Sequence, residues 1–230
     1  MDRRFERTEL LFGKDAMEKL KNKRVLVVGT GGVGGFAVEA IARCGVGNID
    51  LLDFDTVDIT NINRQIIALE STVGRKKVEV CAERVREINP YCNVGVFDMF
   101  YSAETAEEVF KNHYDYIVDA IDIVTSKLHL IQTAHEKNIP IISALGTGNK
   151  SDPMKFKITD ISKTSVCPLA KVVRRELKAR GIPHTKVLFS EEIPMKISQE
   201  NGKMVASNSF TPSIAGLLIG REVVLDLIKE

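Results

Sequence analysis

The sequence predicts an α/β fold: a Rossmann-like, doubly wound and mainly parallel sheet with an extra C-terminal elaboration of strands and a helix. Through the first two-thirds of the 230 residues, short apolar runs alternate with stretches whose apolar residues recur at helical spacing. A glycine loop at residues 29–34 joins the first apolar run to the first helical stretch. Strand–helix alternation of this kind is typical of parallel sheets with right-handed crossovers.

The elements of the first part follow in order along the chain. The strands that we expect from short apolar runs cover residues 24–28, 49–53, 94–97, 116–120 and 140–144. The helices that we expect between them cover residues 33–44, 76–88, 103–111 and 126–137. Gly45 and Asn89-Pro90 are typical residues at the ends of the first two helices.

The strand–helix alternation stops after these elements. Residues 155–161 alternate like a strand with one solvated face, and residues 187–189 and 193–197 predict further strands. A closing helix begins at Thr211-Pro212, because proline is tolerated in a first helical turn, and runs to Ile228. The second part of the chain is therefore an elaboration of the same sheet.

Length and composition indicate one domain, residues 1–230, with a nucleotide-binding core (1–145) and the elaboration (146–230). The chain is 44% hydrophobic and 27% charged, which is ordinary for a globular protein with one large core. Its formal net charge is +1, so no global field attracts a polyanion. Any contact with nucleic acid must therefore come from a local patch.

Neither secretion nor membrane insertion is expected. The N-terminus is charged and lacks the apolar centre of a signal peptide. The longest apolar region, residues 214–228, contains Arg221, Glu222 and Asp226 and is too short and too charged to span a bilayer. The four cysteines form no C-x-x-C pair, so neither a disulfide framework nor a zinc knuckle is indicated, and a cytoplasmic location fits.

The glycine loop has the G-x-G-x-x-G spacing that cradles phosphates. Gly29 permits the tight turn, Gly31 lets the backbone approach a phosphate, with Gly32 beside it, and Gly34 lets helix and strand pack closely. The following helix offers unpaired N–H groups to an anion. Asp53 closes the second strand, where a carboxylate can accept hydrogen bonds from ribose hydroxyls. Alone, this motif indicates only a nucleotide.

Further polar residues distinguish an ATP site from a dinucleotide site. Asn61, Arg64 and Lys77 follow Asp53, and a triphosphate needs more positive charge than a bridging diphosphate. Asp122 follows a later strand at the same sheet edge, where it can hold the Mg²⁺ that accompanies ATP. Each residue alone could be a solvated surface group. Their joint occurrence favours ATP-driven adenylation.

These segments together resemble the ubiquitin-activating-enzyme-like superfamily of ThiF, MoeB and HesA type. The resemblance rests on residues 4–7, 29–34, 53–55, 61–65, 74–77 and 119–122. It implies a ThiF-type adenylating domain that uses ATP and Mg²⁺. Its implied nucleotide-binding residues are Gly29, Gly31, Gly32, Gly34, Asp53, Asp55, Asn61, Arg64, Gln65 and Lys77.

The superfamily resemblance also implies the catalytic roles. Arg64 and Lys77 would act on the phosphates, and Asp122 would bind the metal. Arg7 would reach the ATP of a second subunit across a homodimer interface. Residues 146–230 would then serve substrate binding and dimerisation.

Within the superfamily, the second half resembles the tRNA threonylcarbamoyladenosine dehydratases. The matching pieces include residues 143–146, 152–153, 158–161, 167–169, 180–182 and 209–216. The resemblance implies that ATP activates the carboxylate of threonylcarbamoyladenosine as an acyl-adenylate, and that ring closure then releases AMP. It also raises a sulfur-relay protein as a further partner. Cys167 is either a reactive nucleophile or an unreactive loop thiol.

A basic segment is the candidate contact for tRNA. Residues 171–180 contain five basic residues and one acid. A solvated amphipathic helix explains the pattern equally well from sequence alone, and the resemblance favours binding to the phosphate backbone. The expected tRNA-binding residues are Lys171, Arg174, Arg175, Lys178 and Arg180.

Three other functions compete with the dehydratase. The first is an adenylyltransferase that activates the C-terminus of a ubiquitin-like sulfur-carrier protein, which the absence of paired C-x-x-C motifs disfavours. The second is an NAD-binding oxidoreductase, which has no evident use for Arg64 and Lys77. The third is a non-catalytic nucleotide-binding regulator.

Overall fold

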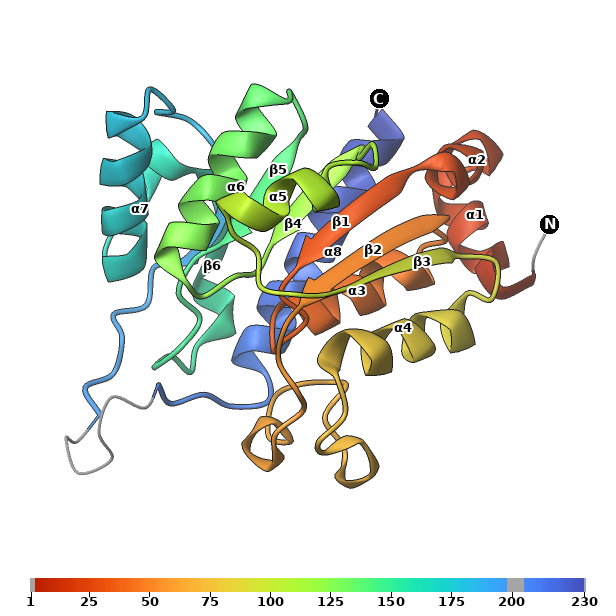
Figure 1. Ribbon diagram of the computed structural model, residues 1–230, viewed down its shortest axis with the longest axis horizontal. Coiled ribbons are helices and arrows are strands. Elements are labelled where there is room, and N and C mark those ends of the chain that lie inside the picture. Colours follow the sequence, from red (N-terminus) through yellow and green to blue (C-terminus); the bar gives the residue numbers. More distant parts are fainter. Residues whose placement is uncertain (1–2, 198–204, 230) are drawn as a thin grey trace.

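The computed structural model describes residues 3–197 and 205–229. One sheet of seven strands runs through the molecule in the order β3-β2-β1-β4-β5-β7-β6. All neighbouring strands are parallel except β6 and β7 at one edge. The predicted doubly wound, mainly parallel α/β fold is therefore confirmed, and the elaboration adds β7 and β6 to the same sheet (Figure 1).

The strands of the sheet lie close to their predicted ranges. They are β1 (Arg24–Val28), β2 (Asn48–Asp53), β3 (Asn93–Asp98), β4 (Tyr116–Asp119), β5 (Ile141–Ala144), β6 (Phe156–Asp160) and β7 (Lys186–Ser190). The α-helices are α1 (Glu6–Phe12), α2 (Lys14–Asn22), α3 (Gly34–Arg43), α4 (Lys77–Ile88), α5 (Ala103–Val109), α6 (Val124–Glu136), α7 (Pro168–Ala179) and α8 (Thr211–Lys229). Short 3₁₀ turns are η1 (Arg3–Phe5), η2 (Ile59–Asn61), η3 (Glu70–Thr72), η4 (Pro153–Lys155) and η5 (Ile161–Lys163).

Two layers of helices cover the two faces of the sheet (Figure 1). Alternate residues of β1 point to opposite sides: Val25 and Val27 pack in the core with α3, α4 and α8, whereas Leu26 and Val28 pack with α5, α6 and α7. None of the helices within residues 3–197 and 205–229 combines the length and apolarity that a bilayer crossing requires.

The predicted strand at residues 193–197 is wrong. This segment belongs to no strand or helix in the structure. Pro194 has no N–H to donate, and the N–H of Met195 donates to the carbonyl of Asn149 in a loop (2.7 Å). Helices α1 and α2, for which we made no prediction, precede β1.

Helix α8 packs closely on α3 through two glycines. A Cβ atom at Gly216 would lie 2.2 Å from the carbonyl oxygen of Val33 and 2.7 Å from Cβ of Phe36. A Cβ atom at Gly220 would lie 2.6 Å from Cβ of Ala40. Since α3 begins directly after the glycine loop, α8 holds the helix that carries this loop.

We expect Gly216→Ala to lower the free energy of unfolding by roughly 1–3 kcal/mol, because the new methyl group must push α8 away from α3. Urea unfolding followed by circular dichroism measures this change. Leu217→Ala is the control on the same helix, since Leu217 is 45% exposed. Equal stability of Gly216→Ala and wild type would contradict the close packing.

Candidate active site

A cavity of about 500 Å³ opens at the carboxyl ends of the parallel strands. In open α/β sheets this edge is where ligands bind. Residues expected to bind nucleotide or metal line the cavity: Gly29, Gly31, Gly32, Asp53, Asp55, Asn61, Arg64, Gln65, Lys77 and Asp122. The elaboration closes another side with Gly146, Thr147, Gly148, Leu169, Val205, Ser207 and Pro212.

The glycine loop at the base of the cavity tolerates no side chain at two positions. Gly29 has φ +90°, and a Cβ atom there would lie 2.7 Å from the carbonyl oxygen of Ala120. A Cβ atom at Gly34 would lie 1.7 Å from the carbonyl oxygen of Gly29. Gly34 does not line the cavity. Its missing side chain allows α3 to start against the end of β1, which brings the N-terminus of this helix to the cavity.

The carboxylate of Asp53 holds this loop in place. Its Oδ2 accepts hydrogen bonds from the backbone N–H (2.7 Å) and the hydroxyl (3.1 Å) of Thr30. Its Oδ1 accepts from the N–H of Asp55 (3.0 Å). Asp53 is buried, yet it lines the cavity. The sequence indicated a ribose contact here, and the structure adds an organising role within the protein.

Residues 54–76 form an excursion beyond the edge of the sheet (Figure 1). Asp58 caps the turn η2, where its Oδ1 accepts from the N–H of Thr60 (2.8 Å). The carbonyl of Thr60 in turn accepts from Nη1 of Arg64 (2.8 Å). Gln65 lies against Gly31, and its Oε1 is buried with no partner among the described residues. The turn therefore directs Arg64 and Gln65 to the cavity.

Lys77 is a buried cation at the start of α4. Only 6% of the residue is exposed, and its Nζ lies 2.7 Å from Oδ2 of Asp55. The Asp55 side chain remains 47% exposed. This pair places a positive charge at the cavity wall together with a half-exposed carboxylate.

Asp122 differs from the other acids because it is exposed and has no hydrogen bond or ion pair within the part of the chain that the structure describes. It follows β4 and lines the cavity beside the glycine loop. No cluster of three or more metal-ligating side chains was found among the described residues. A metal ion at Asp122 would therefore need ligands from a bound molecule.

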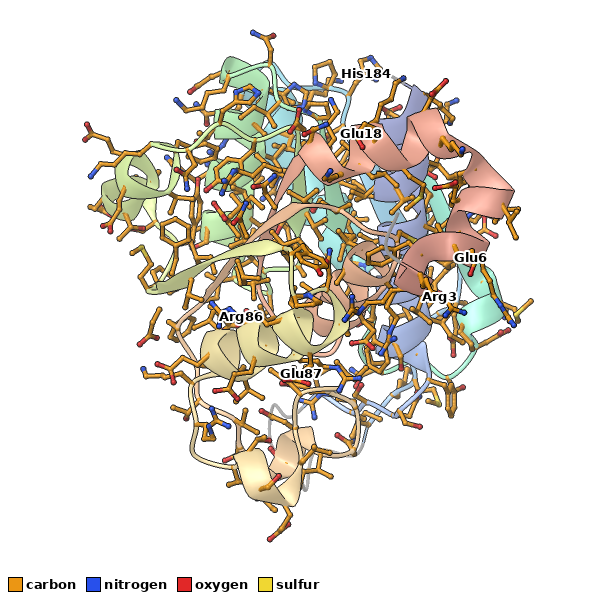
Figure 2. All side chains as sticks on the ribbon, turned by 90° about the vertical axis from the view of Figure 1, so that its right-hand side faces the viewer. Arg3, Glu6, Glu18, Arg86, Glu87 and His184 are labelled. Atoms are coloured by element: carbon orange, nitrogen blue, oxygen red, sulfur yellow. The ribbon has the colours of Figure 1, made fainter. Side chains whose placement is uncertain are left out.

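Arg7 lies away from this cavity. It is exposed on α1, and it is not among the described residues that line the cavity. The preceding Phe5 packs near Gly45, which follows the far end of α3 from the glycine loop. Figure 2 shows its neighbour Glu6 at the surface. Arg7 therefore does not reach the cavity of its own chain. This position is compatible with the expected role, in which Arg7 reaches the cavity of a second subunit.

The basic residues of α7 do not share one environment. Ala170, Val173 and Leu177 form its buried face. Lys171, Arg175 and Lys178 are exposed and lie on the opposite side at i, i+4 and i+7, which we call the α7 stripe. Helix α7 starts next to the cavity, where Leu169 lines it.

Three basic residues of this segment have partners within the protein. Arg175 of the α7 stripe pairs with Glu176 at the surface (2.7 Å). Arg174 donates to the carbonyl (2.7 Å) and hydroxyl (2.6 Å) of Thr164. Arg180 donates to Oε1 of Gln132 (3.0 Å). Of the five basic residues, only Arg174 is therefore partly buried, and Arg180 remains exposed beside the α7 stripe.

Two buried lysines lie near the cavity, and of these the sequence indicated a place by the substrate mouth for Lys150 alone. Lys127 pairs with Asp119 beneath the cavity, and both side chains are fully buried. Lys150 donates to the carbonyl of Gly146 (2.8 Å), and burial lowers the pKa of its ammonium group. A lysine among the apolar residues of a predicted helix was the only sequence signal for Lys127.

The cysteines are poorly placed for nucleophilic chemistry. Cys81, Cys92 and Cys167 are buried, and Cys44 is partly buried. Burial raises the pKa of Cys81 to about 12 and that of Cys92 to about 11. Cys167 packs against Gly146, where an added Cβ atom would lie 3.0 Å from its Sγ. This burial favours the unreactive alternative for Cys167.

Comparison with known proteins identifies close relatives. The sequence model of the ThiF family matches residues 5–227. The chain is 47% identical over 241 residues to the tRNA threonylcarbamoyladenosine dehydratase of Bacillus subtilis (strain 168), covering 98% of this chain and 95% of that protein. Structures of the E. coli tRNA N6-threonylcarbamoyladenosine dehydratase, TcdA, in complex with AMP and with ATP match with TM-scores of 0.91 and 35% identity, over 98% of this chain and 94% of that one.

The competing adenylyltransferase is a more distant relative. Molybdopterin-synthase adenylyltransferase from Haemophilus influenzae is 35% identical over 129 residues, which cover 56% of this chain and 53% of that protein. The similarity to the Bacillus subtilis dehydratase thus extends through both the core and the elaboration, whereas this one covers little more than half of the chain.

We expect Cys81, Cys92 and Cys167 to resist a thiol-reactive chromophore at mildly alkaline pH, because all three are buried away from the reagent. For Cys81 and Cys92 the raised pKa also disfavours the reactive thiolate. All three should react in concentrated urea. The reaction is measured by absorbance, with peptide mass mapping to identify the sites. Rapid labelling of native Cys167 would show that it is accessible.

Proposed function

This chain belongs to the ThiF family, and on that premise we propose that it dehydrates threonylcarbamoyladenosine in tRNA to the cyclic form, using ATP and an acyl-adenylate. The observation that carries the proposal is the 47% identity to a dehydratase of that name over 98% of this chain. The cavity supports it, because phosphate-binding elements of the core face a loop of the elaboration that can receive an acceptor.

The cavity has matching surfaces for the parts of ATP. The glycine loop and the N-terminus of α3 receive phosphate groups, and Asp53 accepts from the ribose. Arg64 and Lys77 neutralise the phosphates, with Asn61 and Gln65 beside them. Asp55 releases Lys77 to the nucleotide when ATP binds. Apolar and aromatic wall residues give the adenine ring a flat surface: Phe54, Phe100, Tyr101, Ile121 and Ile123.

Mg²⁺ fits the exposed carboxylate of Asp122. This ion takes one or two carboxylates together with phosphate oxygens and water, and needs no cage of protein ligands. Asp122 lines the cavity and has no competing partner within the described residues. When bound, the ion would neutralise charge on the phosphates. The chain's own part is to hold one carboxylate at the cavity wall.

The chemistry has two steps that balance without an enzyme-bound intermediate. A carboxylate oxygen of threonylcarbamoyladenosine attacks the α-phosphorus of ATP, the bond to the β-phosphate breaks, and pyrophosphate leaves. A nucleophilic atom of the same side chain then attacks the acyl carbon, loses a proton and expels AMP. The sum removes one water from the substrate. Arg64 and Lys77 stabilise the charge that develops on the phosphates.

The α7 stripe is the proposed contact for tRNA. Lys171, Arg175 and Lys178 span about 10 Å along the helix, which suits neighbouring phosphates of one strand. The stripe begins two residues after Leu169 at the cavity rim. A strand bound there would therefore approach the cavity from the side of the elaboration. Arg174 and Arg180 support this surface from its margins.

A homodimer in the cytoplasm completes the proposal. Arg7 would enter the cavity of the partner subunit, since its own cavity lies at the other end of α3. Residues 146–230 would contribute to the subunit contact as well as to substrate binding. The proposal also includes a sulfur-relay protein as a further partner.

We expect Arg64→Ala and Lys77→Ala to lower turnover on the order of 10²-fold each, because each removes a positive charge that stabilises the departing pyrophosphate. Mass spectrometry of nucleosides from tRNA incubated with ATP measures the loss of one water from threonylcarbamoyladenosine. Lys76→Ala is the matched control, because Lys76 pairs with Asp98 at the surface. Full activity of both variants would favour a non-catalytic regulator.

Acceptor specificity separates the dehydratase from the adenylyltransferase. We expect modified tRNA, and not a carrier protein ending in Gly-Gly, to stimulate exchange between ATP and pyrophosphate, because only the matched carboxylate forms an adenylate in the cavity. Radiolabelled pyrophosphate measures the exchange. If only the carrier protein stimulated the exchange, the dehydratase proposal would be refuted.

Replacing Lys171, Arg175 and Lys178 together by Ala should weaken tRNA binding and reduce the slope of log affinity against log salt by about 2. Filter binding at several salt concentrations measures both quantities. Replacing Lys14, Lys19 and Lys21 of α2 removes the same charge elsewhere and is the control. Equal salt slopes for both triple variants would exclude the α7 stripe as the tRNA contact.

A further inference from the structure

A fully buried ion pair lies directly beneath the candidate active site. Nζ of Lys127, on α6, lies 2.8 Å from Oδ2 of Asp119 at the end of β4, and neither side chain is exposed. The same ammonium donates to the hydroxyl of Ser143 (3.2 Å) and to the carbonyl of Ala144 (3.0 Å) on β5. Its three protons therefore match three acceptors on two neighbouring strands.

Both carboxylate oxygens of Asp119 also accept hydrogen bonds. Its Oδ2 also accepts from the hydroxyl of Ser143 (2.5 Å), and its Oδ1 accepts from the N–H of Ile121 (3.1 Å). This last bond fixes the backbone that turns out of β4 into the cavity wall. Asp122 is the next residue along that wall. Lys127 thus orients Asp119, and Asp119 orients the segment that presents Asp122.

Stability alone does not account for this charged network. Removing two charges from water is costly, and an apolar pair of similar volume is often as stable as a buried ion pair. Lys127, Asp119 and Ser143 do not line the cavity, so they do not touch a bound nucleotide directly. A hydrogen-bonded network can, however, hold the side chains and backbone near a ligand site in one orientation. Apolar packing does this less well, because hydrogen bonds are directional.

We propose that Lys127 is a positioning residue, which acts through Asp119 to hold the carboxylate of Asp122 where it can bind the Mg²⁺ of Mg·ATP. The inference rests on the proposed role of Asp122 as the metal-binding residue. It assigns no contact between Lys127 and the nucleotide. Its distinctive consequence is that Lys127 matters for the metal-dependent part of ATP binding and much less for the metal-free part.

Isothermal titration of the full-length protein tests this consequence without relying on turnover or on tRNA. Binding of ATP is measured with Mg²⁺ and with a chelator, and the ratio of the two affinities defines the Mg²⁺ increment. The proteins are wild type, Lys127→Met, Asp122→Asn and the double variant. We expect Lys127→Met to reduce the Mg²⁺ increment by about 10-fold, as loss of a supporting residue does at metal sites.

The double variant distinguishes positioning from independent effects. If Lys127 acts through Asp122, the double variant has the same Mg²⁺ increment as Asp122→Asn alone, since the carboxylate to be positioned is gone. Multiplicative losses, or an unchanged increment in Lys127→Met, would overturn the inference. An unchanged increment in Asp122→Asn would instead refute the metal-binding role of Asp122, which belongs to the proposed function.

Two further variants guard against a loss of folding. Ser143→Ala keeps the ion pair but removes the hydroxyl that bridges it, so a reduced Mg²⁺ increment is expected in a stable protein. An unchanged increment in this variant would also count against the network. Lys186→Met is the control, because it breaks an ion pair between β7 and α8 that involves Asp226, away from the cavity lining. It should leave the increment at the wild-type value.

Discussion

The close contact between the glycine loop and the start of α3 is the constraint on which the remaining structure depends. Because Gly34 has no side chain, α3 can begin against the carbonyl of Gly29, and its N-terminus points into the cavity. Gly216 and Gly220 let α8 pack on the other side of the same helix. The C-terminal helix α8 therefore supports the helix that carries the glycine loop.

Around this backbone cradle, the polar side chains are mostly held by the protein itself. Asp53 binds Thr30 and the N–H of Asp55, and Lys77 is paired with Asp55. Such contacts place the charges before a ligand arrives, so less reorganisation is needed on binding. Among the charged side chains of the cavity, Asp122 differs, since it has no partner within the described residues. The site thus combines fixed charges with one carboxylate that is open to a ligand.

The sequence predicted much of this site because its residues lie in short segments next to strand ends. Asp53, Arg64, Gln65 and Lys77 all line one cavity, as their positions after β2 indicated. Sequence patterns were insufficient where the structure depends on contacts with residues far along the chain. The apolar residues at 193–197 suggested a strand, but no neighbouring strand accepts its hydrogen bonds. Arg174 belongs to the basic segment by sequence, but Thr164 holds its side chain.

By itself, the sequence determined the alternating strands and helices between residues 24 and 144, the glycine loop and the residue types available at the cavity. These depend on periodicity and on contacts within a few residues, which neighbouring side chains encode directly. Only the tertiary structure decided that Lys127, Asp119 and Ser143 form one buried network, and that Arg7 lies away from its own cavity. The physical reason is that such contacts join separate elements, whose positions follow from how the sheet and its two helical layers pack together.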